Sequence, residues 1–161
     1  MPAPNLLFVM TDHQRADSIG MVQAGVEVCP NLNRLASESA FFQRTYNTCP
    51  LCVPARTAMA TGKYPTRTGV VYNDWQGETA TDQTPIHQML AEAGYEVGHI
   101  GVDHLRVDPS LHERVEFAEY VGATEYKQYL QEQDIDTSAG PDWSAFKTEV
   151  EKRPRISQAK G

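Results

Sequence analysis

The sequence predicts an α/β fold with a mostly parallel sheet flanked by helices. Two observations carry this prediction: a short, fully apolar run near the start, and an alternation of strand-like and helix-like segments after it. The run covers residues 6–10, and its lack of any polar side chain is typical of a buried parallel strand. Polar residues 11–14 follow at once, and open α/β sheets place their ligands at the carboxyl ends of such strands.

The next segments alternate between helix and strand. Asn31 is suited to cap a helix over residues 32–39. Residues 40–46 hold three aromatic side chains and predict a strand. Pro54 is suited to the first turn of a further helix, and Gly62 is suited to its end.

The clearest helix lies in the middle of the chain. It opens at Pro85, carries apolar side chains at helical spacing, and closes at Gly94. Residues 95–100 then predict another strand. This strand and the preceding helix complete the alternation on which the fold class rests.

The signals weaken after residue 108. A helix is expected over residues 124–133, with Tyr126, Tyr129 and Leu130 facing inward. Another is expected over residues 144–152, and the last residues are polar and basic, so we expect them to fray.

The composition predicts one folded domain. A length of 161 residues suits a single domain, and 40% hydrophobic with 22% charged residues disfavours disorder. The net charge of −7 argues against a nucleic-acid partner, because neutralising phosphates needs clustered Lys and Arg. No apolar run approaches the roughly 20 residues of a membrane span. Residues 1–10 lack the basic region and the length of a signal peptide, so we expect a cytoplasmic protein without a membrane partner.

The densest group of chemically active side chains surrounds Cys52. Cys52 lies just before the expected helix at Pro54, where the helix dipole and the backbone amides favour an anion. Arg56 follows one helical turn later on the same side, and its guanidinium can hold an oxyanion through two parallel hydrogen bonds. These residues are compatible with a sulfate or phosphate site.

Simpler interpretations of the cysteines stay open on spacing alone. A cysteine beside a helix is most often a small buried hydrophobic residue. Cys49 and Cys52 have the spacing of a redox pair. They could also form half of a zinc site, but Cys29 is the only other cysteine. Three cysteines in total predict no disulfide framework.

A longer motif changes the weight of these alternatives. Cys52, Pro54 and Arg56, followed by Thr61-Gly62, resemble the signature of the formylglycine-dependent sulfatases. The opening segment, residues 4–12, is similar to that family's first strand and its metal-binding aspartate. Matches to a further block of the family follow at Gly94-Tyr95, Ile100-Gly101 and His104-Leu105. The resemblance implies an alkaline-phosphatase-like sandwich, here incomplete, with a mostly parallel sheet flanked by helices.

The resemblance implies a reaction and a role for Cys52. A separate maturation enzyme would oxidise Cys52 to formylglycine, whose hydrate presents two hydroxyls. One hydroxyl would bind a divalent cation and attack the sulfur of a small-molecule sulfate ester, and the other would then lose its proton and expel sulfate. Asp12 is similar to a ligand of that metal, which is most often calcium, with manganese and magnesium as alternatives. Arg56 would orient the formylglycine.

Three more residues are implied as substrate contacts: His13, Asn73 and His104. His104 matches the family's active-site histidine and is therefore also a candidate catalytic residue. An ordinary turn residue is nearly as good an interpretation of Asn73. A histidine considered without the motif would more often be structural than functional.

The sequence departs from the family pattern in two side chains. His13 stands where many sulfatases carry a second aspartate, and imidazole is a poor calcium ligand, so His13 is expected to face the substrate or to adjust metal preference. Val102 stands where sulfatases commonly carry a sulfate-binding lysine. These departures keep two alternatives open, a phosphonate monoester or phosphodiester hydrolase of the same superfamily and a non-catalytic remnant.

The third departure is length. Family members run to several hundred residues, and their remaining metal ligands come from later strands that cannot be located in this sequence. The chain is therefore expected to be an amino-terminal fragment with an incomplete active site. Residues 1–108 would form the first part of the catalytic domain, and residues 109–161 its helical and loop continuation.

Overall fold

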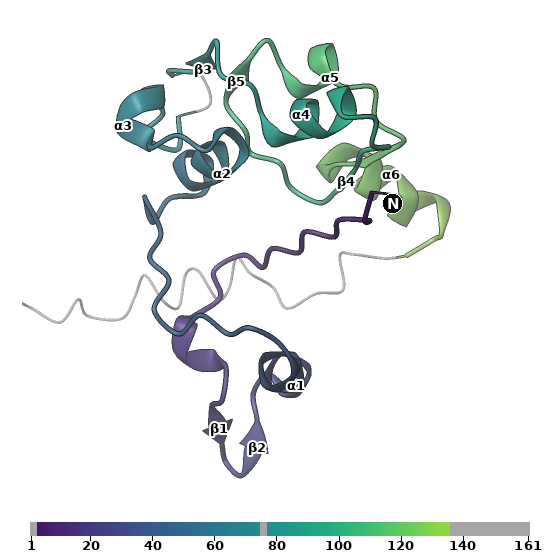
Figure 1. The fold of residues 1–161 in the computed structure, drawn as a ribbon. Helices are drawn as coiled ribbons and strands as arrows, with labels where there is room; N and C mark the ends of the chain where they lie inside the picture. Colours follow the sequence, from purple (N-terminus) through teal and green to yellow (C-terminus); the bar gives the residue numbers. More distant parts are fainter. Residues whose placement is uncertain (1–2, 75–76, 136–161) are drawn as a thin grey trace, which may run out of the picture. The chain divides into compact units, whose positions relative to one another are not determined.

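The computed structural model describes residues 3–74 and 77–135 (Figure 1). The chain divides into two units, Met1–Tyr46 and Asn47–Gly161, and each is described by itself. The helix expected over residues 144–152 and the basic end lie outside the described residues. The domain boundary expected near residue 108 stays a prediction.

The first unit contains a hairpin and one helix. Its elements are the 3-10 helix η1 (Ala16–Ser18), the strands β1 (Val22–Gln23) and β2 (Val26–Glu27), and the helix α1 (Pro30–Glu38). The two strands pair antiparallel through a tight turn at Ala24-Gly25, where both residues have positive φ. Positive φ at both central turn positions matches the right-handed twist of the flanking strands, and glycine adopts it without strain. The backbone N–H of Gly20 donates to Asn33 Oδ1 at 2.6 Å, which ties the hairpin to α1.

Three predictions for the first unit need correction. Helix α1 begins at Pro30, so Asn31 lies inside its first turn and does not cap it. Proline is favoured at this first helical position because its φ is preset and its missing N–H needs no partner. Residues 6–10 and 40–46 form no strand, and the side chains of the first run are between 39% and 90% exposed. A strand is stabilised by its neighbour's hydrogen bonds, and no described strand pairs with either run.

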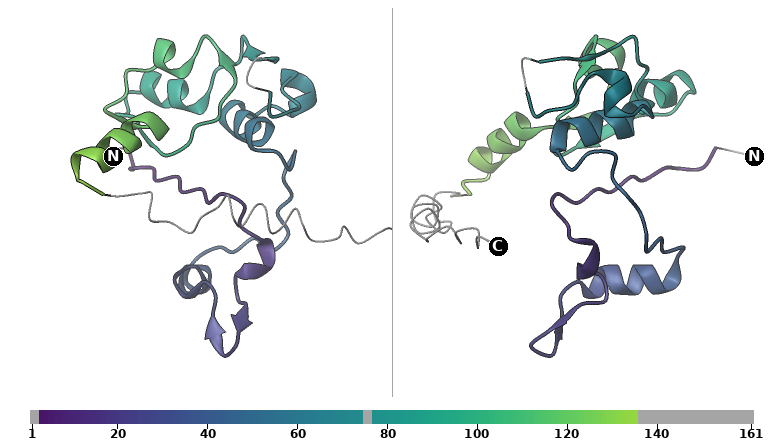
Figure 2. Two further views of the ribbon diagram at one scale, coloured as in Figure 1. Left: turned by 180° about the vertical axis from the view of Figure 1, so that it is seen from behind. Right: turned by 90° about the vertical axis from the view of Figure 1, so that its left-hand side faces the viewer.

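The second unit is built from short parallel strand pairs and five helices within its described residues (Figure 2). The helices are α2 (Cys52–Thr61), α3 (Pro65–Thr68), α4 (Ile86–Glu92), α5 (Leu111–Arg114) and α6 (Ala123–Glu132). The strands are β3 (Ala80–Thr81), β4 (Gly98–Ile100), β5 (Val107–Asp108) and β6 (Glu119–Val121). None of the helices in the described part of the chain has the length and apolarity needed to cross a membrane.

The strand pairing confirms a mixed α/β architecture. β3 pairs parallel with β5, and β4 pairs parallel with β6, so helical or loop segments separate the partners in both pairs. Parallel partners require such crossovers, which is why strand and helix signals alternate in the sequence. The two pairs stay separate in the described residues, so they do not form one continuous sheet.

The helices of this unit begin and end close to where the sequence predicts. α2 ends at Gly62, whose φ of 67° is left-handed and whose N–H donates to Ala58 O at 2.8 Å. α4 follows Pro85, and Gly94 behind it also has positive φ. Helix α6 confirms the expected helix over residues 124–133, but its tyrosines, Tyr126 and Tyr129, are more than half exposed. The predicted inward orientation of these rings is therefore wrong.

The core of the second unit forms around α2. Its buried hydrophobic residues come from α2, the loop after α3, both strands of the first parallel pair, and α5; they are Val53, Val70, Ala80, Val107 and Leu111. Pro54 is also fully buried. Helix α5 is tied to α4 through Arg114, whose Nη1 donates to the side-chain oxygen of Gln88 at 3.1 Å. The buried side chains of Val53 and Pro54 pack the first turn of α2 into this core.

A histidine and aromatic cluster fills the space between α4, α5 and the second parallel pair. It consists of His87, His99, His112, Phe117 and Tyr120. His99 and Tyr120 are cross-strand partners whose rings stack with centroids 5.4 Å apart. Burial, and secondarily the neighbouring His99, hold the pKa of His87 below its ordinary value.

Replacing Val70 by alanine should lower the free energy of unfolding by about 2 kcal/mol, because two methyl groups leave a packed core. Val70 is 2% exposed, whereas its neighbour Val71 is 43% exposed. Val71→Ala is therefore the matched control and should change the free energy of unfolding by about 0.5 kcal/mol or less. Urea titrations of both variants measure the difference, and equal losses would contradict the assigned core.

His87 should make the protein less stable as the pH falls. Because the pKa of His87 is lowered in the folded state, the unfolded state takes up a proton first. Above pH 6.5, the ordinary pKa of histidine, His87 is neutral in both states and costs the folded state nothing. The free energy of unfolding should decline as the pH falls below 6.5 toward the lowered pKa of the folded state. His87→Gln should remove part of this decline in urea unfolding measured at several pH values. His13→Gln, the same change at a side chain that is 83% exposed, is the matched control, and equal changes in both variants would contradict the assignment to His87.

Candidate active site

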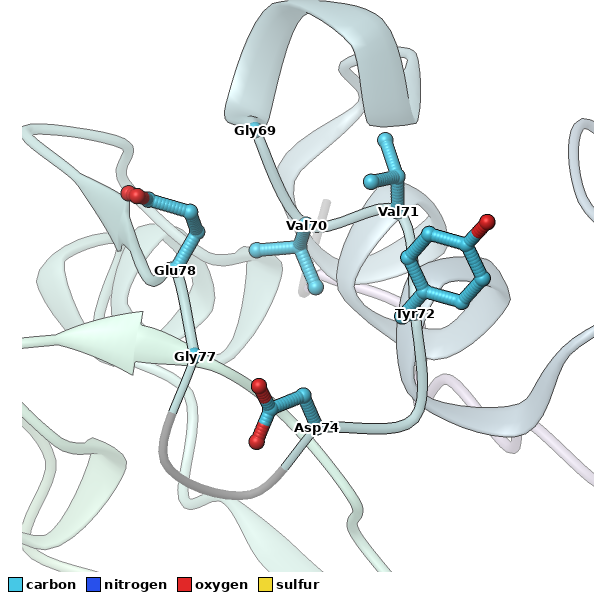
Figure 3. Close-up of a pocket in the computed structure, with 7 residues that line it drawn as sticks. All are labelled: Gly69, Val70, Val71, Tyr72, Asp74, Gly77 and Glu78. Atoms are coloured by element: carbon cyan, nitrogen blue, oxygen red, sulfur yellow. The ribbon is translucent and has the colours of Figure 1, made fainter.

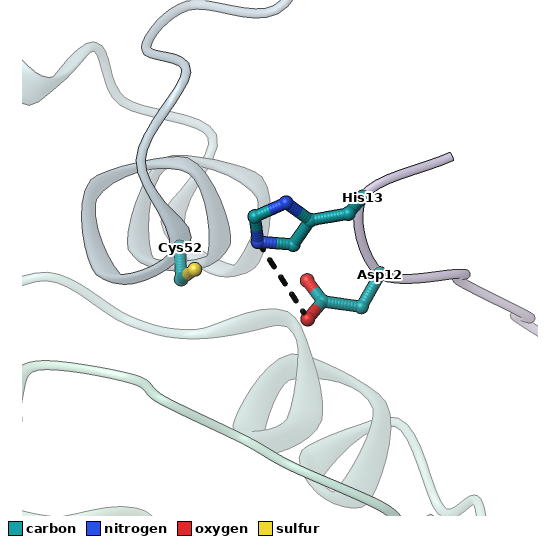
Figure 4. Close-up of side chains that lie close together, drawn as sticks. All are labelled: Asp12, His13 and Cys52. Carbon is teal, nitrogen blue, oxygen red and sulfur yellow. Dashed lines mark ion pairs between the residues drawn. The ribbon is translucent and has the colours of Figure 1, made fainter. Parts of the chain in front are cut away.

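Cys52 is the first residue of α2 (Figure 4). The residue before it, Leu51, has an extended backbone and supplies no side-chain cap. The cap comes from 20 residues away, because Asn73 Oδ1 accepts the backbone N–H of Val53 at 3.0 Å. Asn73 therefore fixes the amino end of the helix next to Cys52. Its predicted contact with substrate stays a prediction.

The three cysteines are free and half-buried. Cys49 and Cys52 are thus not joined in this structure, although their spacing allows a redox pair. The backbone N–H of Cys49 donates to Asn47 Oδ1 at 3.3 Å, which shapes the turn leading into α2. Cys52 is therefore neither fully exposed nor fully buried.

One face of α2 holds the segment that carries His104. Arg56 Nη1 donates to the carbonyl oxygen of Val102 at 2.9 Å. Thr57 Oγ1, on a fully buried side chain, accepts the backbone N–H of Arg106 at 3.1 Å. His104 lies between these two attachment points. The structure therefore connects Cys52, Arg56 and His104 through one helix and one short segment.

Both predicted site histidines have unusual backbone conformations. His104 has φ of 48° and His13 has φ of 53°, in the left-handed region that non-glycine residues rarely occupy. Such conformations persist where the surrounding structure holds them, and they concentrate at functional sites. Gly101, with φ of 114°, precedes the His104 segment where the chain leaves β4, and any side chain there would be strained.

Asp12 and His13 lie in the first unit and form a pair of their own. His13 Nε2 is 4.0 Å from Asp12 Oδ2, the contact drawn in Figure 4. The His13 side chain is 83% exposed and the Asp12 side chain is 65% exposed. A carboxylate oxygen suits a hard divalent cation, so the chemistry of Asp12 fits the predicted metal. An imidazole suits such an ion poorly, which agrees with a different task for His13.

A hollow of about 260 Å³ lies in the loop that leads to Asn73 (Figure 3). It is lined by Gly69, Val70, Val71, Tyr72, Asp74, Gly77 and Glu78. The lining includes one aromatic residue, Tyr72, and two acidic residues, Asp74 and Glu78. Because Asn73 belongs to the same loop, the loop that lines this hollow is hydrogen-bonded to the start of α2 at Val53.

Two contacts in this region were not predicted from the sequence. Thr57 reads as an ordinary helical residue, and its partner Arg106 is 49 residues away. Tyr120 donates its hydroxyl to Asp103 Oδ2 at 2.9 Å across 17 residues. The only available hint for Thr57 is its position beside Arg56 within the motif, and Tyr120 has none.

The chain is similar to known sulfatases over most of its length. The family model described as Sulfatase matches residues 4–155. The uncharacterized sulfatase YidJ of Escherichia coli is 33% identical over 107 residues, which cover 65% of this chain and 21% of that protein. Human steryl-sulfatase is 29% identical over 126 residues, which cover 73% of this chain and 21% of that protein.

A further relative is the ulvan-active sulfatase of Formosa agariphila, which is 29% identical over 102 residues. Those residues cover 63% of this chain and 20% of the relative. The chain thus spans about a fifth of the length of the curated relatives it matches. No solved structure matches it.

Asn73→Ala should destabilise the protein by about 1–2 kcal/mol, because the N–H of Val53 loses its partner at a buried helix start. Asn73→Asp is the matched variant. It keeps an acceptor oxygen and places a negative charge at the amino end of α2, so its stability should stay near that of the unaltered protein. Chemical unfolding of both variants tests the cap, which would be refuted if alanine and aspartate behaved alike.

Proposed function

Because the chain belongs to the sulfatase family, we propose that the protein hydrolyses a sulfate monoester with a formylglycine made from Cys52 and a divalent cation. The observation that carries this proposal is the position of Cys52 as the first residue of α2, followed by Pro54 and Arg56 in the spacing of the family signature. The names of the relatives support sulfate ester hydrolysis, since they include steryl-sulfatase and N-acetylgalactosamine-6-sulfatase. The protein would also need a maturation enzyme as a partner.

The first contribution of this chain is an electropositive end of a helix. The dipole of α2 and its backbone amides favour negative charge beside Cys52, and a sulfate group carries that charge. When present, the hydrated aldehyde supplies the attacking oxygen, and the cation activates it and stabilises charge on the sulfate. Asn73 keeps the helix start in place through its bond to Val53.

Arg56 would orient the group at position 52 and the sulfate oxygens. Its Nη1 is anchored on Val102 O, which restricts the rotation of a long side chain. A guanidinium carries five N–H donors in a planar fork, and this geometry suits two oxygens of one oxyanion. Val102 itself offers no charge, so Arg56 has a larger share of this task than in a protein with a lysine at position 102.

His104 would contact the ester group. Its segment is attached to α2 on both sides, at Val102 and at Arg106, so the imidazole is carried by a fixed piece of backbone. An imidazole can hold or release a proton near neutral pH, which suits a group that faces a departing alcohol oxygen.

Asp12 would supply one oxygen ligand to the cation, and calcium is the metal we propose. Calcium takes 6–8 oxygen ligands, so Asp12 and the oxidised residue 52 would be a minority of its ligands. A thiol is a soft ligand and suits calcium poorly, whereas the oxidised residue offers oxygen. Conversion of Cys52 and metal binding are therefore chemically linked. His13 would face the substrate, and a cytoplasmic location stays a prediction.

Co-expression of the complete gene product with a formylglycine-generating enzyme should convert Cys52 to the aldehyde. Mass spectrometry of the peptide that contains residues 49–56 measures the conversion. Cys49 lies in the same peptide and should stay a thiol, which provides an internal control. A peptide with two unmodified thiols after co-expression would refute the formylglycine mechanism.

The converted protein should hydrolyse an aryl sulfate, and Cys52→Ala should abolish turnover because the attacking oxygen is lost. Cys49→Ala is the matched control and should retain most of the activity. Removing divalent cations with a chelator should stop turnover, and calcium should restore it best. An aryl phosphonate assayed in parallel separates sulfate from phosphonate ester hydrolysis. Turnover of the phosphonate alone would overturn the proposal.

A further inference from the structure

The segment that bears His104 has no regular secondary structure of its own. It leaves β4 at Gly101, whose N–H donates to Val121 O at 2.8 Å, and it reaches β5 at Val107. Between these points the described backbone is neither helix nor strand. The left-handed conformation of His104 costs of order 1–3 kcal/mol, so contacts from outside the segment must hold it.

Helix α2 supplies two of these contacts, and β6 supplies a third. The α2 contacts are the bonds from Arg56 to Val102 and from Arg106 to Thr57. The third is the hydroxyl of Tyr120, which donates to Asp103 Oδ2 at 2.9 Å. Asp103 is the residue directly before His104, so among these three bonds this one lies nearest to His104 along the chain.

Tyr120 is well suited to hold a fixed position. Its ring stacks on that of His99, with centroids 5.4 Å apart, and meets the His112 ring edge-on, with centroids 4.3 Å apart. The centroid of the Phe117 ring lies 5.3 Å away. Aromatic contacts of this kind restrict the ring, so its hydroxyl points in one direction. Burial, together with the hydrogen bond to Asp103, raises the pKa of Tyr120 to about 12. The phenol therefore stays a proton donor throughout the neutral pH range.

We infer that Tyr120 is a positioning residue, which acts through Asp103 to hold the His104 segment in its left-handed conformation. Tyr120 touches neither Cys52 nor the sulfate in this scheme, and its effect on the reaction passes through the backbone of residues 103–104. The catalytic part of this inference rests on the proposed function. Its structural part concerns the segment alone.

Tyr120→Phe in the complete gene product tests the inference, because it removes the hydroxyl and keeps the ring in the cluster. We expect kcat to fall by about tenfold to a hundredfold with KM changed less than about twofold, since a displaced group affects the reaction more than binding. The amides of residues 102–105 should exchange with deuterium at least about tenfold faster, while the amides of α2 keep their rates. Tyr126→Phe removes the same hydroxyl from an exposed position on α6 and should change neither quantity.

Changes at Asp103 separate positioning from general packing. Asp103→Ala should match Tyr120→Phe, and the double variant should lose no more than either single variant, because both remove one bond. Asp103→Asn retains an acceptor oxygen for the Tyr120 hydroxyl, so its kcat should lie near that of the unaltered protein and above that of Asp103→Ala. Wild-type kcat and exchange in Tyr120→Phe would overturn the inference, as would faster exchange spread over the whole second unit. If the unaltered protein hydrolyses no sulfate ester, the proposed function fails, and deuterium exchange at residues 102–105 alone decides whether Tyr120 holds the segment.

Discussion

The buried hydroxyl of Thr57 joins the parts of the second unit on which its candidate site depends. It accepts the N–H of Arg106, and the carbonyl oxygen of Arg106 accepts the N–H of Ala80 at 2.8 Å. The backbone of Arg106, the residue just before β5, is therefore hydrogen-bonded to α2 through its N–H and to β3 through its carbonyl oxygen. A buried polar group has a high cost when its partner is lost, so this arrangement tolerates little displacement of α2 against the strands. Cys52 is the first residue of this helix and is therefore held in place together with it.

The sequence predicts those elements whose signals are local. Helix α2 has Pro54 in its first turn and Gly62 in the left-handed conformation behind it. Helix α4 is preceded by Pro85 and followed at a short distance by Gly94, which also has positive φ. The alternation of strands and helices predicts parallel pairing, which the structure confirms in two pairs. Residues 6–10 show the limit of such reasoning. Their apolar side chains indicate that the run needs a neighbour, but not which one, and no described strand fills that role. The alkaline-phosphatase-like sandwich stays a prediction for the same reason.

The candidate site divides along a similar line. Cys52 and Arg56 are recognisable because they occur four residues apart in one motif, and the family match supports that interpretation. The residues that hold them in place come from elsewhere in the chain. Asn73 caps α2 from a loop, Thr57 binds a residue 49 positions away, and Tyr120 reaches Asp103 across 17 positions. No helical or strand periodicity connects such partners, so they can be identified only from the folded structure. The metal ligand Asp12 and the roles of His13 and His104 stay predictions that rest on the motif.

The exposed run at residues 6–10 has a consequence for how the protein behaves in solution. It is apolar, uncharged and free of proline, and these are properties of segments that pair with other copies of a chain. Burial does not protect it in this structure, and the net charge of −7 opposes the approach of copies. Salt screens that repulsion over distances of about 10 Å at 0.1 M ionic strength. The colloidal stability of the chain is therefore tied to ionic strength, and dilute salt is the condition that best preserves separate molecules.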